Sequence, residues 1–377
     1  MISLDRYPQK ELQLRTTALF IVISALTIAP AMSLERRLYV TDRSGISVYD
    51  IDNGHKLLRK IELPGTGDYK GIAASPQLGK LYVTSFKGDA LICIDLLNDA
   101  VLWKKKYGKY ADSMAITPDG QTMYLPFRDE DSWWVVNAAD GAVKAKIQIG
   151  QGKNYPVDPI ATTGPHNTWI NTAGTRVYME VLTLPWIFIA DTATNKVIGK
   201  IGPFSKGVRP FAITEDEKYA VGNVDGLLGF EVAAVRTGDE WGGKMLYRVE
   251  ARTPEQRLAE LPHPPPHKPH STPSHGVNIR PDQKEVWVVD GVYGYVYAYD
   301  FTAMPPKYLA SVPLYKDPQA QPHPGWITFG LDGRYVYPDG GAVIDTKTKK
   351  VVARIPTSEK LIEVDFQDGK PVKAGHR

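Results

Sequence analysis

A recurring pattern in this 377-residue chain begins, in most of its copies, with a residue that can carry a charge. This leading residue stands directly before a short apolar stretch and six positions before the Pro, or its equivalent, of a turn. The residues at the leading position are Lys70, Asp112, His166, Arg209, His275, Gly325 and Leu361. Where it is Gly325, His323 lies two positions earlier. If the copies surround one axis, these side chains meet at a single opening.

These residue types suit two kinds of chemistry. Three imidazoles, from His166, His275 and His323, are the smallest set that holds Cu, Zn or Fe with open positions. A divalent or copper ion held there would bind O₂ or polarise a substrate group. Without a metal, an imidazole would act as a general base while cations hold a carboxylate or phosphate. The catalytic candidates are then His166, His275 and Asp112, and the substrate-binding candidates are Lys70, Arg209 and His323.

A simpler interpretation of the leading residues stays open. The opening of a channel is wet, so polar side chains there need only be solvated. A wet channel explains Lys and Arg easily, but three His in one ring less easily. Burying cations and imidazoles together is unfavourable unless they are paired. Asp112 offsets one charge, and we expect an anion, a metal or an acidic substrate to accompany the others.

The pattern that positions these residues is a strand, a Pro/Asp/Gly turn and a second strand rich in Tyr and Val. Examples are "GIAASPQLGKLYVTS" (71–85) and "GVNIRPDQKEVWVVD" (276–290). There are six complete copies, most of them followed by a third strand that ends near an Asp and by a fourth strand. Four strands in a unit of about 40 residues are typical of a β-propeller blade.

A seventh copy is divided between the ends of the chain. The segment "RRLYVTD" (36–42) begins abruptly at a second strand, and "LIEVDFQDGK" (361–370) supplies the missing first strand and turn. Pairing the two segments completes a blade and leaves no exposed edge. The sequence therefore predicts an all-β, seven-bladed β-propeller over residues 34–377, closed by pairing of the C-terminal strand with the N-terminal blade.

Short motifs in these copies resemble those of a known family. "LYVTD" (38–42), "LYVTS" (81–85) and "ITPDG" (116–120) are similar to the repeats of the YVTN family of seven-bladed β-propellers. That family groups with exported propellers of the nitrous-oxide-reductase-like and methylamine-dehydrogenase heavy-chain types. The resemblance covers essentially all of residues 34–377 and implies the fold, whereas propellers host many unrelated activities. Related-looking propellers carry His-bound copper, but no CxxCH motif for covalent haem occurs.

The first 33 residues differ from the rest of the chain. Three basic residues within positions 1–15 precede an uncharged apolar stretch, 16–33, that ends in small residues. This pattern predicts a signal peptide cleaved after Ser33, and hence an exported, periplasmic or secreted, protein. The alternative is an uncleaved anchor, although Pro30 and a run of about 14 apolar residues make a membrane span marginal. The single cysteine, Cys93, suits an oxidising compartment and is expected to be a buried core thiol.

Two long connections run into first strands, at 150–165 and 238–275, and we expect both to lie over the opening. The second contains His263, His267 and His270, which are either a metal-capturing tract or incidental to a stiff polyproline-like loop. In the second strand of the His166 copy, Tyr178 and Glu180 are weaker candidates for the site.

Two functions from different classes stay open. The first is an exported propeller with a small-molecule or metal site at the channel mouth. It would be a His–metal oxidoreductase of copper type, or a lyase or hydrolase acting on an acidic small molecule. The second is a non-catalytic propeller that binds a protein, peptide or cell-envelope partner. A net charge of +3 without long runs of one sign argues against nucleic acid. We expect a monomer with a small, anionic ligand.

Overall fold

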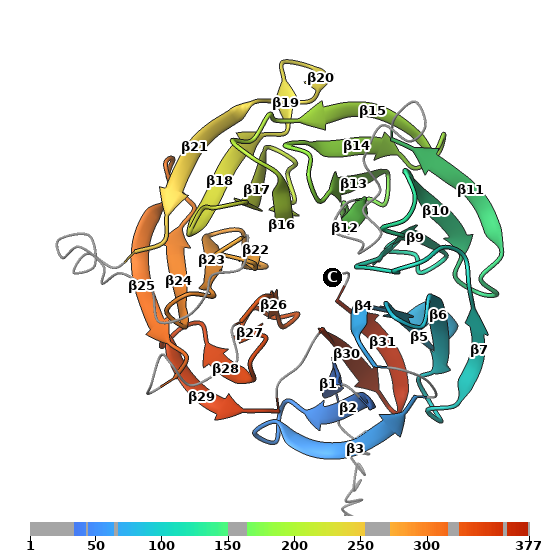
Figure 1. Ribbon diagram of the computed structural model, residues 1–377. Helices are drawn as coiled ribbons and strands as arrows, with labels where there is room; N and C mark the ends of the chain where they lie inside the picture. Colours follow the sequence, from blue (N-terminus) through green and yellow to red (C-terminus); the bar gives the residue numbers. More distant parts are fainter. Residues whose placement is uncertain are drawn as a thin grey trace, which may run out of the picture. The chain divides into compact units, whose positions relative to one another are not determined.

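The computed structural model describes residues 34–42, 44–63, 67–149, 164–252, 272–315, 324–356 and 360–375. Residues 34–377 form one compact unit. Its strands build seven antiparallel sheets of four or five strands, arranged as blades around an axis, and one small two-stranded sheet (Figure 1). The predicted all-β, seven-bladed propeller is confirmed. Within the described residues, no helix is long and apolar enough to cross a membrane.

The blades are numbered here in the order of their first strands, which lie nearest the axis in blades 1 to 6. Blade 1 comprises β4 (Tyr69–Ser75), β5 (Lys80–Ser85), β6 (Ala90–Asp95) and β7 (Val101–Lys105), with the 3₁₀ turn η1 (Pro76–Leu78). Blade 2 comprises β8 (Ala115–Ile116), β9 (Thr122–Pro126), β10 (Ser132–Asn137) and β11 (Val143–Gln148). Blade 3 comprises β12 (Pro165–Ile170), β13 (Arg176–Val181), β14 (Ile187–Asp191) and β15 (Lys196–Ile201).

The remaining blades follow the same plan. Blade 4 comprises β16 (Val208–Ile213), β17 (Tyr219–Val224), β18 (Gly229–Ala234) and β21 (Met245–Glu250). Blade 5 comprises β22 (Val277–Ile279), β23 (Glu285–Asp290), β24 (Tyr295–Asp300) and β25 (Lys307–Pro313). Blade 6 comprises β26 (Ile327–Phe329), β27 (Tyr335–Pro338), β28 (Ala342–Asp345) and β29 (Lys350–Arg354). Blade 7 comprises β30 (Leu361–Gln367), β1 (Leu34–Thr41), β2 (Gly45–Asp50), β3 (Lys56–Glu62) and β31 (Lys370–Ala374).

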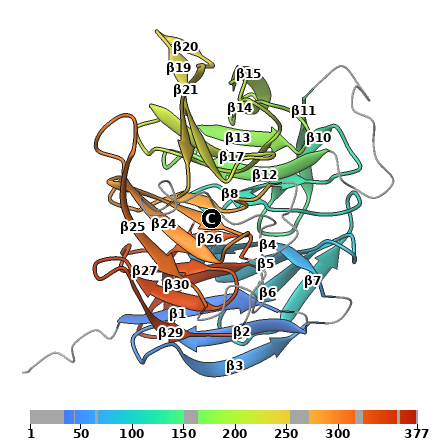
Figure 2. The ribbon, with the colours of Figure 1, turned by 60° about the vertical axis from the view of Figure 1, so that its left-hand side comes forward.

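Blade 7 closes the ring as predicted. Strand β1 pairs antiparallel with β30, from Leu34 opposite Gln367 to Val40 opposite Leu361. The blue N-terminal and red C-terminal strands therefore share one sheet (Figures 1 and 2). The structure adds a strand that the sequence analysis did not predict, because β31 pairs with the other side of β30 and becomes the innermost strand of the blade.

The recurring Tyr of the second strands packs between neighbouring blades. Tyr82 in β5 is fully buried, and its hydroxyl donates to the Ala138 carbonyl of blade 2 at 2.6 Å. Tyr337 in β27 is also buried, and its hydroxyl lies 2.9 Å from Nε2 of His55 in blade 7. Second strands are buried on both faces because each blade is covered by two neighbours. This explains their near-continuous apolar sequences.

One predicted connection is partly wrong. Residues 238–250 were expected to form part of a loop over the opening, but they contain β21 and most of a small hairpin, β19 (Arg236–Thr237) with β20 (Glu240–Trp241). The ring of Trp241 lies between the guanidinium groups of Arg176 and Arg236, at 4.4 and 3.5 Å from its centroid. Arg236 belongs to the hairpin, whereas Arg176 belongs to β13, so the stacking of Trp241 on Arg176 joins the hairpin to blade 3. Residues 150–163 and 253–271 of the two predicted loops, including His263, His267 and His270, lie outside the described residues.

Candidate functional site

The antiparallel order of strands brings two positions of each blade to the same opening, called here the mouth. A first strand begins at the mouth and ends at a turn on the opposite side, and the second strand returns. The leading residue and the residue at the end of the second strand therefore belong to one end of the propeller. Each blade can place a pair of side chains there.

β-bulges orient three of the leading residues. The register between first and second strands shifts between Tyr69 and Gly71, between Pro165 and Thr168, and between Val208 and Phe211. These shifts enclose Lys70, His166 and Arg209. A bulge adds a residue to one strand, breaks the simple alternation of side chains and turns a side chain to a new direction.

Four of the predicted positions come together in the structure. Nε2 of His166 lies 3.8 Å from Oδ2 of Asp112 in the preceding blade. The imidazole rings of His166 and His275 have centroids 6.1 Å apart. Nδ1 of His275 in turn donates to the Gly325 carbonyl at 2.7 Å. Leading residues of blades 2, 3, 5 and 6 are thus neighbours at the mouth.

The other predicted positions have different surroundings. Arg209 is close enough to act electrostatically on His166. Lys70 forms an ion pair with Asp68, with 2.8 Å between Nζ and Oδ1. Leu361 is buried in the core, and the residue before it, Lys360, supplies a charge to the mouth instead. His323 lies outside the described residues.

Most leading residues at the mouth are bound by the end of the second strand of their own blade. Arg128 contacts Oδ2 of Asp112 through Nε at 2.6 Å and Nη2 at 2.5 Å. Nε of Arg209 donates to Oδ1 of Asp225 at 2.9 Å. In blade 6, Oδ1 of Asp339 accepts from the backbone N–H groups of Gly325 and Trp326. Sequence reasoning missed Arg128, Asp225 and Asp339, although each follows its leading residue by 14 or 16 positions.

The most enclosed part of the site is a group of three side chains in blade 3. Glu180 is 0% exposed, and its Oε1 is hydrogen-bonded to Nδ1 of His166. The side-chain amide of Asn167 donates to Oε1 of Glu180 at 2.9 Å and lies 2.8 Å from Nδ1 of His166. Oε2 of Glu180 and Oδ1 of Asn167 are buried and have no hydrogen-bond partner among the described residues.

Burial determines the protonation of this group. It raises the pKa of the Glu180 carboxyl well above its usual range, because the charged form would be desolvated. Burial likewise lowers the pKa of His166 well below its usual value, and the positive charges of Arg128, Arg209 and Lys360 act in the same direction. Both shifts favour the uncharged forms, a protonated Glu180 beside a neutral His166.

The neutral state fixes the tautomer of His166. Both groups around Nδ1, the protonated Glu180 carboxyl and the Asn167 amide, are donors, so Nδ1 accepts. The ring proton is therefore assigned to Nε2, on the side of Asp112. His166 presents an N–H donor toward the mouth.

Cations from three further blades surround this donor. Arg128 comes from blade 2, Arg209 from blade 4 and Lys360 from the start of blade 7, and all three contribute a positive potential at the His166 ring. Nζ of Lys360 also lies 2.9 Å from the centroid of the Trp326 ring. Asp112 and Asp225 hold the two guanidinium groups in place. The mouth thus gathers N–H donors and positive charge around one imidazole.

The described residues provide only part of the metal site predicted from His166, His275 and His323. Nδ1 of each described imidazole has a partner, Glu180 or the Gly325 carbonyl, but only His275 donates through Nδ1 as metal-binding histidines commonly do. However, no group of three His, Cys, Asp or Glu within the described ranges is placed to hold a metal ion. The third predicted ligand, His323, is not among the described residues, so the metal site stays a prediction.

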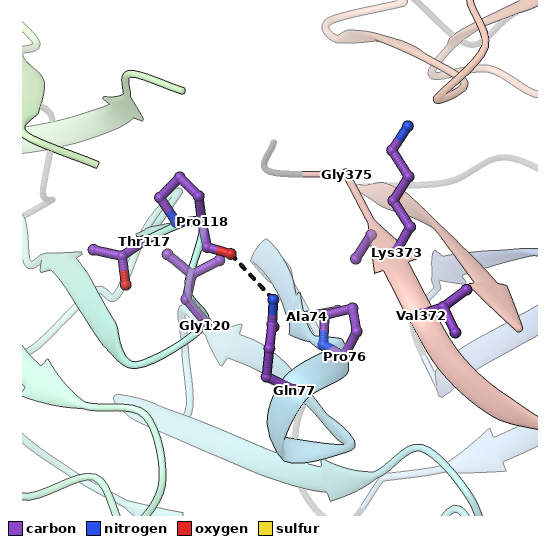
Figure 3. A pocket seen from close by; sticks show the side chains of 11 residues that line it. Ala74, Pro76, Gln77, Thr117, Pro118, Gly120, Val372, Lys373 and Gly375 are labelled. Atoms are coloured by element: carbon purple, nitrogen blue, oxygen red, sulfur yellow. Dashed lines mark hydrogen bonds between the residues drawn. The ribbon is translucent and has the colours of Figure 1, made fainter. Parts of the chain in front are cut away.

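A separate pocket of about 130 Å³ lies at the turn end of blades 1 and 2 (Figure 3). It is bounded by η1, by the turn at 117–120 and by the inner strand β31. Nε2 of Gln77 donates to the Pro118 carbonyl at 3.2 Å and closes one side. The side chain of Tyr178 lies toward the turn end and not at the mouth, because its hydroxyl donates to Glu217 in the turn of blade 4 at 2.5 Å. Neither feature contributes to the group around His166.

Comparison with known proteins supports the fold alone. No family model matches the chain, and no curated protein matches it. A protein from Lactobacillus plantarum shares 14% identity over 87% of this chain and 99% of its own, with a TM-score of 0.67. Hydrazine synthase from Kuenenia stuttgartiensis shares 14% identity over 85% of this chain and 93% of its own, with a TM-score of 0.60.

A third similar structure is dihydro-haem d1 dehydrogenase NirN in complex with DHE. It shares 13% identity over 90% of this chain and 75% of its own, with a TM-score of 0.59. These identities are too low to transfer an activity. The chain is a seven-bladed β-propeller whose structural neighbours include enzymes, and its membership of the YVTN family remains a prediction.

Proposed function

We propose that the mouth binds a small acidic molecule, a carboxylate or a phosphate, and that His166 donates a proton to it. The observation that carries this proposal is the convergence of donors. The Nε2–H group of His166 lies among the positive charges of Arg128, Arg209 and Lys360, which come from three other blades. Positive potential and N–H donors are what an anionic ligand requires.

The buried group behind His166 gives the donor a chemical role. When Nε2–H passes its proton to the ligand, the proton of Glu180 can move to Nδ1. The imidazole stays neutral, and the negative charge appears on Glu180, where Arg209 and Arg128 stabilise it. This transfer makes His166 a general acid, suited to protonating a leaving group or a developing oxyanion. A lyase or hydrolase acting on an acidic small molecule would use it.

A metal is the second candidate, favoured by the Nδ1 anchors of both histidines. With a divalent or copper ion, Nε2 of His166 and of His275 would be ligands and Glu180 would be ionised. We prefer the anion proposal because Arg128, Arg209 and Lys360 all act as positive charges on His166, although Asp112 and Asp225 offset two of them. Export after cleavage at Ser33 also remains our proposal, because residues 1–33 lie outside the described residues.

Ligand-dependent stabilisation tests the proposal. The probes are succinate, inorganic phosphate, CuCl₂ and ZnCl₂, added to protein purified without a His-tag. A ligand at about 100 times its Kd stabilises the folded state by about 2.7 kcal/mol, which raises the melting temperature. We expect succinate or phosphate to raise the melting temperature of the wild type and not that of Arg209→Gln.

Arg59→Gln is the matched control, because Arg59 also pairs with an aspartate, Asp99, but does so in the turn after β6. It should retain the response to the anion. Failure of both anions to stabilise the wild type, or an equal response in Arg209→Gln, would overturn the proposal. Stabilisation by copper or zinc alone would establish the metal site instead.

A further inference from the structure

The strand that closes the ring carries two buried carboxyl groups on one face. Glu363 and Asp365 are two positions apart on β30, so their side chains point the same way. They are only 3% and 8% exposed. The two carboxyl groups lie close enough to interact directly. Glu363 Oε1 and Asp365 Oδ1 have no hydrogen-bond donor among the described residues.

A hydrogen bond between two carboxyl groups requires a proton on one of them, because an ionised carboxylate only accepts. The other oxygen of Glu363 is already used. Its Oε2 accepts from the backbone N–H of Leu331 in blade 6 at 2.7 Å. Gly330 allows this approach, since a Cβ there would lie 2.7 Å from the same oxygen. Glu363 therefore joins the closing strand to the neighbouring blade.

Charged groups on every neighbouring element face the pair. On β1, Arg36 lies opposite Asp365, but its guanidinium also binds Asp52 and Asp332, at 2.5 Å each. On β31, Lys373 lies opposite Asp365 from the other side. From blade 6, Asp332 and the hydroxyl of Tyr337, which is bonded to His55, also interact with Glu363. Arg36 is thus shared among several carboxylates and does not neutralise the pair alone.

We propose that Glu363 and Asp365 share one proton and that this proton acts as a pH-sensitive latch on ring closure. With the proton in place, the two carboxyl groups can stay buried where β30 meets β1 and β31, and Glu363 keeps its hydrogen bond from Leu331 of blade 6. Without it, two adjacent buried carboxylates repel each other at the only seam where the two ends of the described chain meet.

The direction of the pH dependence follows from burial. Burial raises the pKa of Glu363 to about 7 from its ordinary 4.5, and it also raises the pKa of Asp365. The folded state then holds the proton more tightly than the unfolded chain does. The stabilisation of the folded state by this proton is complete below pH 4.5 and is lost as the pH rises toward 7.

Hydrogen exchange of the full chain measures the seam directly. Between about pH 5 and pH 7, we expect protection factors of β1 and β30 amides to fall by up to tenfold per pH unit, the limit for release of one proton. In Glu363→Gln, the side-chain amide donates permanently to Asp365, so the fall at β1 and β30 should shrink to the fall seen in the other blades, to which Glu180 contributes. Asp365→Asn removes the second carboxyl group, so no proton can be shared. This variant should also flatten the dependence of the protection factors on pH.

Glu285→Gln is the matched control. Glu285 joins blade 5 to Lys349 of blade 6 at 2.6 Å, as Glu363 joins blade 6 to blade 7. Its variant should keep the wild-type pH profile at β1 and β30. The pH dependence of the wild type tests the proposal even if a variant fails to fold. Protection at β1 and β30 that stays constant from pH 5 to 7, or a full fall in both seam variants, would overturn the latch.

Discussion

Replacing Glu180 by Gln tests the protonation on which the site's chemistry depends. Glu180 is fully buried, and burial raises its pKa well above the ordinary 4.5, so the folded protein carries its proton at neutral pH. The unfolded chain releases that proton above pH 4.5. The wild type therefore loses stability through this group as the pH rises, by at most about tenfold in the folding equilibrium per pH unit. Glu180→Gln has no such proton to release.

The difference in unfolding free energy between Glu180→Gln and wild type should consequently rise between pH 5 and pH 7, by up to about 3 kcal/mol, the limit for release of one proton. Urea denaturation at pH 5, 6 and 7 measures it. At pH 5 the variant should lie within about 1 kcal/mol of the wild type, because one hydrogen bond to His166 replaces another. If Glu180 were ionised beside a charged His166, the variant would instead lose about 3–5 kcal/mol.

Glu231→Gln provides the control for this measurement. Glu231 is also 0% exposed, but its oxygens accept from Ser205 N at 2.9 Å and from Arg248 at 3.4 Å. An amide N–H would face these donors, so this variant should lose stability and show no gain with rising pH. A Glu180→Gln difference that stays flat from pH 5 to 7 would refute the neutral pair.

Two further predictions concern the packing of the blades. Tyr337→Phe leaves Nε2 of His55, a residue 6% exposed, without its hydroxyl partner and should cost about 1–3 kcal/mol in urea denaturation. Tyr335→Phe, which keeps its ring beside His55, should cost less, and equal losses would contradict the role of the hydroxyl. Burial raises the pKa of Cys93 to about 12, so a thiol reagent at pH 8 should label it only when the protein unfolds. Rapid labelling of folded protein, detected by mass spectrometry, would contradict this.

The fold was predictable because its signals are local. An alternating strand, a Pro/Asp/Gly turn and a Tyr/Val-rich strand repeat often enough to count the blades, and the incomplete copies at the two ends indicated the closing pair β1 and β30. Strand β31 was missed because Pro371 and two lysines within five residues do not give a strand pattern. The β19–β20 hairpin was missed because strands of two residues carry no periodicity.

The site was only half predictable. The position of the leading residues in the repeat indicated that His166, His275 and Asp112 lie near one another. Their partners depended on the pairing register, which β-bulges shift at His166 and Arg209. A shift of one residue reverses the side of the strand to which a side chain points, so alternation alone could not assign Arg128 or Asp225 to the mouth.

The side-chain pairs at the mouth and at the turn end of this propeller are distributed differently. At the mouth, Asp112 with Arg128, His166 with Glu180, and Arg209 with Asp225 are pairs within single blades. At the turn end, pairs join neighbouring blades, as Arg59 with Asp99 and Arg176 with Glu217 do. A pair within one hairpin can change its partners without opening the seam between blades. The ion pairs of the mouth can therefore change more easily than those of the turn end, although the His166–Asp112 and His275–Gly325 contacts also cross between blades.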